Sequence, residues 1–278
     1  NADSTVTKPL LFSKKGVIIS QGITPAYGDI DMYDMAACAI DTAIRNAVAS
    51  GADIDRLALL DNFCWCSSNE PERLGQLKKA AQACYDYSIA YQTPFISGKD
   101  SMYNDFKGYD EKDLPIKISI PPTLLISSIS VMDDVLKSVS LDLKIPGDLI
   151  YIIGDTYDEL GGSEYYAMNG FIGNYVPRVN AEKNRKVYKA FYKCIEKEII
   201  ASSISIGRGG LGIALVKTAI AGMLSIDISL RGLLGSTTRD DFALFSESQG
   251  RIIVTVNPAN KKEFEKIMKG NSFALIGN

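Results

Sequence analysis

Apolar residues recur at helical spacing in several stretches of the chain. Between Tyr33 and Ser50 they fall at Ala36, Ile40, Ala43, Ala47 and Val48, and the following glycine supplies a C-terminal stop. This spacing predicts a helix with one buried face over residues 33–50. The same criterion predicts four more helices, over residues 74–89, 180–201, 210–221 and 259–269.

Short apolar runs bounded by turn residues alternate with these helices and predict strands. The runs cover residues 56–61, 94–97, 123–132, 149–154, 224–230, 251–256 and 272–277. Residues 107–122 are rich in charge, Pro and Gly, so we expect a loop there with a short edge strand. Strands and helices that take turns through both halves predict an α/β fold.

A Pro-Gly turn at residues 144–148 interrupts this pattern before the strand at 149–154. A chain of 278 residues, 46% of them apolar, is long enough for two ordinary domains. We therefore expect an N-terminal domain over residues 1–145 and a C-terminal domain over residues 146–278.

Charge and length exclude several classes of function. The net charge is −3, from 30 basic and 33 acidic residues spread along the chain, which argues against a nucleic-acid role. No apolar run approaches the ~20 residues that span a bilayer, and the start NADSTVTKPLLF lacks the order of a signal peptide. Five irregularly spaced cysteines indicate reduced thiols, so we expect a cytoplasmic protein without a membrane partner.

The sequence contains no histidine, the commonest general base near neutral pH and the commonest metal ligand. Its chemistry must therefore use carboxylates, lysines, backbone dipoles or groups from another chain segment. The pair Cys64 and Cys66 has no second cysteine pair to complete a zinc site, so we interpret both thiols as bystanders.

Two stretches combine residue types suited to a ligand. Asp61 ends a predicted strand, where its carboxylate could face a ligand or cap a turn with similar odds. In SGKDS, Gly98 permits close backbone approach, Lys99 could neutralise phosphate, Asp100 could hold Mg²⁺ and Ser101 could donate to a phosphate or hydroxyl. A solvated turn is the equally weighted alternative for this second stretch.

Two glycine-rich stretches are weaker signals. DELGGSEYY, residues 158–166, has paired glycines between carboxylates, which ordinary loops also contain. GRGGLGIALVKTAIAG, residues 207–222, leads into a helix whose free N–H groups could bind an anion. It matches neither the GxxxxGK[ST] loop nor the dinucleotide pattern, so we favour a tightly packed helix start.

Taken in order, YGDIDMYDMAACAIDTAIRNAVASGAD, ALLDNFCW, PFISGKDSMYND, IPPTLLISSISVMDD, ELGGSEYY and LFSESQGRIIV resemble the second half of phosphoribosylformylglycinamidine synthase. The resemblance covers nearly the whole chain, and the DNFCW and PFISGKDS blocks are its most specific parts. It implies one unit of the aminoimidazole ribonucleotide synthetase-like superfamily: an α/β (α+β) pair of domains with a mixed sheet and helices in each. The N-terminal domain would form a nucleotide and substrate wall and a dimerisation surface.

That resemblance implies an ATP-dependent ligase of purine biosynthesis. ATP and Mg²⁺ would convert formylglycinamide ribonucleotide and glutamine-derived ammonia to the amidine, ADP and phosphate. The partners implied are the missing N-terminal half of the same protein, a glutaminase domain or subunit and a second copy in a homodimer. Since the chain starts at Asn1 without Met, we expect a piece of a longer protein that is inactive alone.

The resemblance also implies roles for single residues. Asp61 and Gly98 match positions that contact ATP, and Ser101 matches one that contacts the ribonucleotide. Lys99 stands where some relatives have a metal-binding Asn, so we assign it to ATP phosphate, and Asp100 remains the candidate for metal. No catalytic residue is expected in this half, because the family's catalytic histidine lies in the first.

Departures from the family pattern leave alternatives open. Arg208 replaces an aspartate expected to bind metal, and the substrate-contacting role of a related triplet is not transferred to residues 247–249. The chain could instead be a catalytically silent scaffold that holds a nucleotide or assists assembly. A small-molecule kinase of the same superfamily is a third reading, for which Asp3 offers only a faint acidic cluster.

Overall fold

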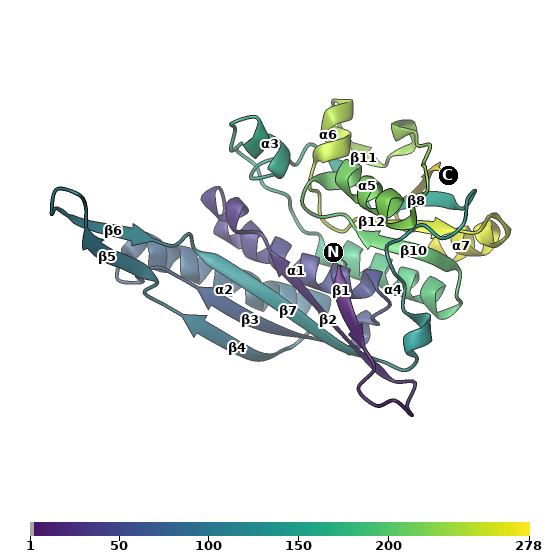
Figure 1. The fold of residues 1–278 in the computed structure, drawn as a ribbon, viewed down its shortest axis with the longest axis horizontal. Coiled ribbons are helices and arrows are strands. Elements are labelled where there is room, and N and C mark those ends of the chain that lie inside the picture. The colour runs from purple at the N-terminus through teal and green to yellow at the C-terminus, as the bar shows by residue number, and fades with distance from the viewer. Residues whose placement is uncertain (1–2) are drawn as a thin grey trace.

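The structure, a computed structural model that describes residues 3–278, is built around two larger β-sheets, each with helices against it (Figure 1). The first sheet has the order β1-β2-β7-β3-β4, in which β3 and β4 are parallel and the other pairs antiparallel. Its strands are β1 (Ser4–Thr7), β2 (Gly16–Ile23), β7 (Thr123–Met132), β3 (Leu57–Cys64) and β4 (Phe95–Ser101). The predicted α/β class is confirmed.

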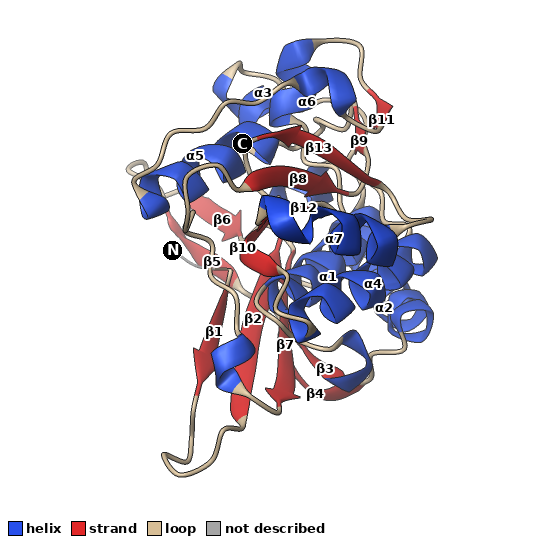
Figure 2. Ribbon diagram, turned by 90° about the vertical axis from the view of Figure 1, so that its right-hand side faces the viewer, coloured by secondary structure: helices blue, strands red, loops and turns tan. Residues whose placement is uncertain are grey.

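Helices α1 (Met32–Ala49) and α2 (Pro71–Tyr91) cover one face of this sheet, as Figure 2 shows. The helix α1 begins where the side chain of Asp31 accepts the N–H groups of Tyr33 and Asp34, at 2.8 and 3.0 Å. Alanines fill much of its buried surface, and such small side chains allow its backbone to lie close to β2. Both predicted helices are confirmed.

Gly22 of β2 lies directly under α1, where a Cβ would overlap the carbonyl oxygen of Ala39 and the backbone nitrogen of Ala43. Because helix backbone cannot move aside, Gly22→Ala should lower the free energy of unfolding by about 2–3 kcal/mol. Gly75→Ala is the matched control, since Gly75 is an exposed glycine of α2 with open space around it and should gain about 1 kcal/mol. Urea unfolding measures both; a neutral Gly22→Ala would contradict this close packing.

The charged stretch that we expected to be a loop with one short strand is a two-stranded hairpin. Strands β5 (Asp105–Tyr109) and β6 (Pro115–Ser119) pair antiparallel and project beyond the first sheet (Figure 1). The carboxylate of Asp110 closes the turn by accepting the N–H groups of Lys112 and Leu114, at 2.8 and 2.9 Å. The expectation of a single strand was wrong. The hydrogen-bonded turn at Asp110 allows two strands to pair here although the stretch is rich in polar residues.

The second sheet is antiparallel throughout, in the order β10-β12-β8-β13. Its strands are β10 (Ile200–Ser205), β12 (Ile252–Val256), β8 (Leu149–Ile153) and β13 (Phe273–Gly277). Side chains from alternate strand positions enter two separate apolar clusters, one packed on α5 and one containing residues of α4 and α7. These helices are α4 (Ala181–Glu196), α5 (Gly210–Gly222) and α7 (Lys261–Met268).

Two predictions for this half differ from the structure, one in the end of a helix and one in a strand. The helix predicted to residue 201 ends at Glu196, because Glu198 takes a left-handed conformation (φ 56°) and the chain turns into β10. The strand predicted over residues 224–230 is absent from the described chain, where only an isolated bridge joins Ile228 to Gly277. Short elements between the strands were not predicted: α3 (Glu164–Met168), β9 (Thr156–Tyr157), β11 (Gly235–Ser236) and α6 (Asp240–Phe245). No helix within residues 3–278 has the length and apolar character needed to cross a membrane.

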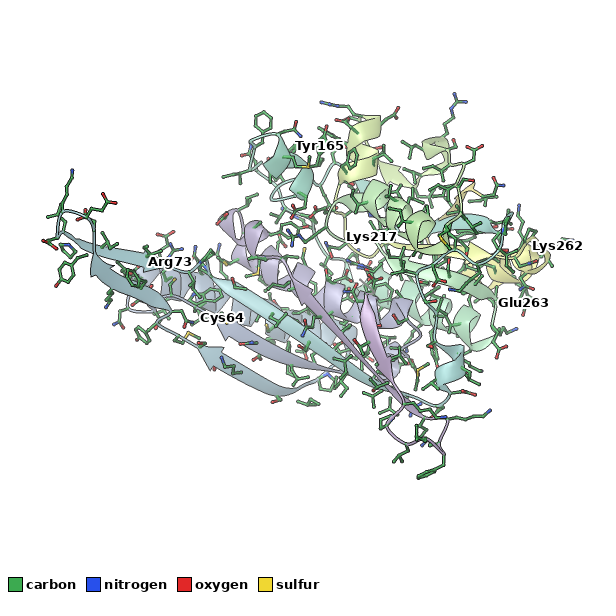
Figure 3. All side chains as sticks on the ribbon, viewed as in Figure 1. Cys64, Arg73, Tyr165, Lys217, Lys262 and Glu263 are labelled. Atoms are coloured by element: carbon green, nitrogen blue, oxygen red, sulfur yellow. The ribbon has the colours of Figure 1, made fainter. Side chains whose placement is uncertain are left out.

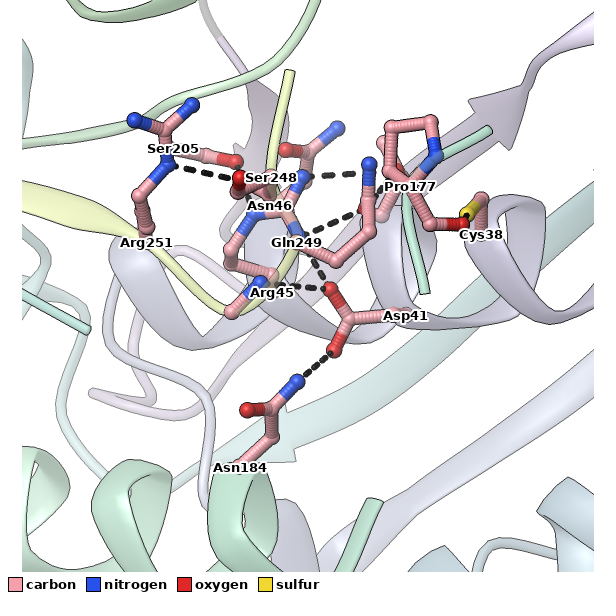
Figure 4. Close-up of polar contacts among 12 residues, drawn as sticks. Cys38, Asp41, Arg45, Asn46, Pro177, Asn184, Ser205, Ser248, Gln249 and Arg251 are labelled. Atoms are coloured by element: carbon pink, nitrogen blue, oxygen red, sulfur yellow. Dashed lines mark hydrogen bonds and ion pairs between the residues drawn. The ribbon is translucent and has the colours of Figure 1, made fainter. Parts of the chain in front are cut away.

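A buried ion pair on α1 connects this helix with α2, with α4 and with the second sheet (Figure 4). Asp41 and Arg45 form it, and both side chains are inaccessible to solvent. The carboxylate of Asp41 also accepts hydrogen bonds from Tyr91 (2.5 Å), Tyr188 (2.7 Å), Asn184 (3.0 Å) and the N–H of Gly250 (3.1 Å). The Arg45 guanidinium donates to Ser205 (2.8 Å) and Gln249 (2.9 Å). Residues from α1, α2, α4 and the second sheet thus share one polar cluster.

Candidate functional site

The two stretches singled out in the sequence lie side by side at the edge of the first sheet. Strands β3 and β4 are parallel neighbours, and their register pairs Asp61 with Gly98, Asn62 with Lys99, Phe63 with Asp100 and Cys64 with Ser101. Strand β4 is the last in the sheet, and its residues 96–100 are exposed. The predicted ligand-contacting residues therefore occupy one open edge, which we call the β3–β4 edge.

Asp61 is positioned by its close approach to Gly98 and by the backbone N–H of Lys99. Its carboxylate lies directly over Gly98, where any Cβ would overlap its oxygens, so glycine is required for this close approach. Burial raises the pKa of Asp61, the nearby charge of Asp100 raises it further, and a hydrogen bond from the N–H of Lys99 opposes both. A half-buried carboxylate with one backbone donor keeps lone pairs free for a ligand.

Strand alternation divides the predicted site residues between two faces. Asp61 and Asp100 lie on the face covered by α2, because they share strand parity with the buried Leu59 and Phe63. Lys99 and Ser101 lie on the opposite face, which no helix covers. A ligand that touches both pairs must therefore extend over strand β4.

Ser101 is anchored by residues that sequence reasoning did not select. Its carbonyl oxygen accepts the N–H of Trp65 (2.8 Å) and the side-chain amide of Asn104 (2.7 Å). The amide of Asn104 also lies 3.1 Å from the Ser101 hydroxyl. Trp65 is fully buried. As the only tryptophan of the sequence, next to a strand end, it could have been predicted to anchor this site.

The cysteines that flank Trp65 do not form a metal site. Cys66 is buried and Cys64, labelled on the first sheet in Figure 3, is half-buried; both are free thiols. Within residues 3–278 no group of three or more Cys, Asp or Glu side chains is placed to hold a metal ion. Any Mg²⁺ at the β3–β4 edge must therefore take part of its coordination from the substrate or from water.

The glycine-rich start of α5 is occupied by one of the protein's own carboxylates. Glu247 is 1% exposed and accepts the N–H groups of Gly209 (2.8 Å) and Glu164 (3.0 Å) and the hydroxyl of Tyr27 (2.5 Å). A carboxylate there satisfies free N–H groups and complements the helix dipole, as a bound anion would. Arg208, which replaces the expected aspartate, forms an ion pair with Glu164. The contacts at this helix start are thus internal to the protein.

A cavity of about 210 Å³ lies beside this helix start, between β2 and α1 on one side and β10 and α5 on the other. Among the residues that line it are Asn46, Ser205, Lys217 (Figure 3) and Gln249. Asp3 enters from the N-terminal segment, accepts the N–H of Ser205 at 2.6 Å, and has a pKa raised by burial. The volume is below the roughly 300–1,000 Å³ of usual ligand pockets. This cavity is therefore small for an intact nucleotide.

Comparison with known proteins gives relatives for the whole chain. Residues 146–278 match the family described as AIR synthase related protein, C-terminal domain. The phosphoribosylformylglycinamidine synthase subunit PurL of Methanocaldococcus jannaschii is 32% identical over 264 residues, which is 94% of this chain and 35% of that protein. PurL of Caldanaerobacter subterraneus is 32% identical over 256 residues, 92% of this chain and 33% of that protein. The chain spans about a third of the length of these relatives.

Solved structures share the fold at lower sequence identity. Thermotoga maritima PurL complexed with FGAR has a TM-score of 0.78 at 17% identity and covers 100% of this chain with 43% of its own. The HypE–HypF complex gives 0.71 at 18% identity, covering 99% of this chain and 86% of that one. AaThiL complexed with AMPPCP and TMP has a TM-score of 0.66 at 13% identity, and the match covers 100% of this chain and 84% of that one.

Residues 146–278 match the AIR synthase related C-terminal domain family, and the whole chain shares its fold with Thermotoga maritima PurL. Over nearly its entire length the chain is homologous to PurL, a subunit of phosphoribosylformylglycinamidine synthase, of which it spans about a third. The resemblance stated from the sequence is confirmed.

Proposed function

We propose that this chain supplies one part of the active site of an ATP-dependent ligase that forms formylglycinamidine ribonucleotide. The observation that carries the proposal is the pairing of Asp61 with Gly98 at an exposed sheet edge, in a homologue of PurL. PurL of Thermotoga maritima has also been solved in complex with ATP and with ADP. Since the chain spans about a third of its relatives, the remainder of the protein would complete the site.

In this proposal the β3–β4 edge holds the nucleotide and part of the substrate. Asp61 and the backbone at Gly98 contact ATP, and the exposed ammonium of Lys99 neutralises its phosphates. Ser101, on the uncovered face with Lys99, contacts the sugar phosphate of formylglycinamide ribonucleotide. A nucleotide lying across β4 would reach both faces, which the exposure of residues 96–100 permits.

The residues at this edge fit a magnesium ion bound together with ATP. Asp100 and Asp61 lie on the same face and are near enough for the charge of Asp100 to raise the pKa of Asp61. Mg²⁺ in nucleotide sites commonly takes one or two carboxylates and completes its shell with phosphate oxygens and water. When bound, the ion would neutralise phosphate charge, with Asp100 as its protein ligand.

The reaction requires placement more than a nucleophilic side chain. The amide oxygen of the substrate attacks the γ-phosphorus of ATP and releases ADP; ammonia then adds to the activated carbon and phosphate leaves, giving the amidine. Both steps depend on alignment and on neutralising phosphate charge. Asp61, Lys99 and Ser101 can perform this role although the sequence has no histidine.

The uncovered face of the first sheet is the surface that we assign to a partner. Its apolar side chains are exposed or half-buried, namely Val17, Ile19, Ile23, Ile129 and Val131. A sister unit from the missing N-terminal half, or a second copy in a homodimer, would remove this surface from water. A glutaminase domain or subunit would supply ammonia to the assembled, cytoplasmic protein.

A catalytically silent scaffold is the second candidate, and one observation favours it. At the start of α5, Glu247 satisfies the free N–H groups and Arg208 occupies the position of the expected metal-binding aspartate. This second helix-start site therefore has a structural role in either reading. The two candidates differ only in whether the β3–β4 edge takes part in turnover.

Complementation tests the proposal. The chain alone is expected to release no phosphate from ATP with formylglycinamide ribonucleotide and ammonia, since it spans about a third of its relatives and supplies only part of the site. Adding the remainder of the protein should restore phosphate release and yield a complex larger than either part by light scattering. Phosphate release by this chain alone would contradict a shared site. So would a rate of phosphate release by the remainder of the protein that does not change when this chain is added.

A further inference from the structure

A small cavity near the start of β8 contains a buried carboxylate without a partner. Asp148 is 5% exposed, and within residues 3–278 neither of its carboxylate oxygens has a hydrogen-bond partner. The cavity has a volume of about 20 Å³, enough for one water-sized particle. Residues from the 143–148 turn, the segment after α5 and strand β12 line it, so it lies in the second sheet, away from the β3–β4 edge.

The negative charge of Asp148 is not balanced by a basic side chain. Burial raises the pKa of Asp148, and no charged neighbour counteracts this effect. Lys144 lines the same cavity, but its ammonium is engaged with Asp142 at 2.6 Å and with the hydroxyl of Ser140 at 2.7 Å. An uncompensated buried carboxylate is costly, so the cavity must either keep the acid protonated or hold a cation.

The surroundings favour a cation over a protonated acid. Ser225 and Thr255, whose side chains carry hydroxyl oxygens, are among the residues that line the cavity, together with residues 143–148. Thr255 shares a hydrogen bond with Ser202 at 2.6 Å and still has a free lone pair. The helix α5 ends at Gly222, against the backbone of Leu143, with no basic residue in its last turn. The negative end of its dipole thus adds to the potential that attracts a positive charge.

We propose that this cavity binds one monovalent cation, with Asp148 as its charged ligand and neutral oxygens completing the shell. One carboxylate balances one positive charge, and Asp148 is the only acidic side chain among the described residues that line the cavity. The ion would join the 143–148 turn, the end of α5 and β12. It is therefore a structural ion whose effect appears in stability.

Thermal unfolding of the whole chain tests the site. After dialysis into choline chloride, addition of NaCl or KCl at constant ionic strength is expected to raise the Tm by about 2–5 °C in a saturable manner. Asp148→Asn should abolish the rise, since it removes the charge and keeps the shape. Asp133→Asn is the matched control, because its carboxylate pairs with Arg56 away from the cavity, and it should retain the rise.

Two outcomes overturn the proposal: a wild-type Tm that is the same in choline, sodium and potassium chloride, or a rise that persists in Asp148→Asn. If Asp148→Asn does not fold, binding of thallium(I) to the unaltered chain is measured instead. Crystals of the unaltered chain soaked in thallium acetate should show an anomalous peak beside Asp148. A cavity free of thallium at saturating concentration would exclude the ion. Neither measurement depends on turnover, so both can fail while the proposed function stands.

Discussion

Asp61→Ala is expected to lower kcat/KM of the complete synthetase by about 100- to 1,000-fold. The carboxylate is held over Gly98 and beside the backbone of Lys99, so it is positioned before the ligand arrives. Loss of one preorganised polar group at a charge-developing centre typically costs this factor. Phosphate release with ATP, ammonia and formylglycinamide ribonucleotide measures it.

Neighbouring variants distinguish a ligand-contacting role from a structural one. Lys99→Gln should raise the KM for ATP about tenfold or more, since it removes a charge-assisted contact to phosphate. Ser101→Ala should raise the KM for the ribonucleotide and leave that for ATP near its original value. Glu111→Ala, an exposed carboxylate in the hairpin turn, is the control without effect. Full turnover by a folded Asp61→Ala protein would leave the chain as a scaffold.

Asp41→Ala is expected to lower the free energy of unfolding by about 3–5 kcal/mol. It leaves the guanidinium of Arg45 buried without its counter-charge, and such an uncompensated charge is strongly destabilising. It also leaves the buried Tyr91 and Tyr188 hydroxyls without their acceptor. Urea unfolding followed by circular dichroism measures the change.

Two further variants test the physical reason for that loss. Replacing both Asp41 and Arg45 by apolar residues of similar volume should restore much of the stability, because no lone charge remains. Asp133→Ala breaks the exposed pair with Arg56 and should change stability by less than about 1 kcal/mol. A double variant less stable than Asp41→Ala would show that the hydrogen-bond network outweighs the charge.

Helices and the central strands were predictable because their signal is local. The apolar spacing of residues 33–50 and the buried run of residues 123–132 depend only on period, and both elements appear within a residue or so of the predicted bounds. Local pattern failed where long-range pairing decided the outcome. Residues 224–230 have the pattern of a strand, yet in the structure only Ile228 forms a bridge, to Gly277, and the chain turns into a short 3-10 helix at Leu230–Gly232.

By itself, the sequence determined the class of fold, the family resemblance and the residue types available for chemistry. Only the tertiary structure placed Asp61 against Gly98, and only it placed Lys99 and Ser101 together on the opposite face of the sheet. The reason is that the register between two parallel strands 30 or more residues apart is a long-range property. The same holds for Glu247, which satisfies a helix start nearly 40 residues away, and for the unpartnered Asp148. Whether a carboxylate is paired, buried or free is decided by its neighbours in space, which no local pattern contains.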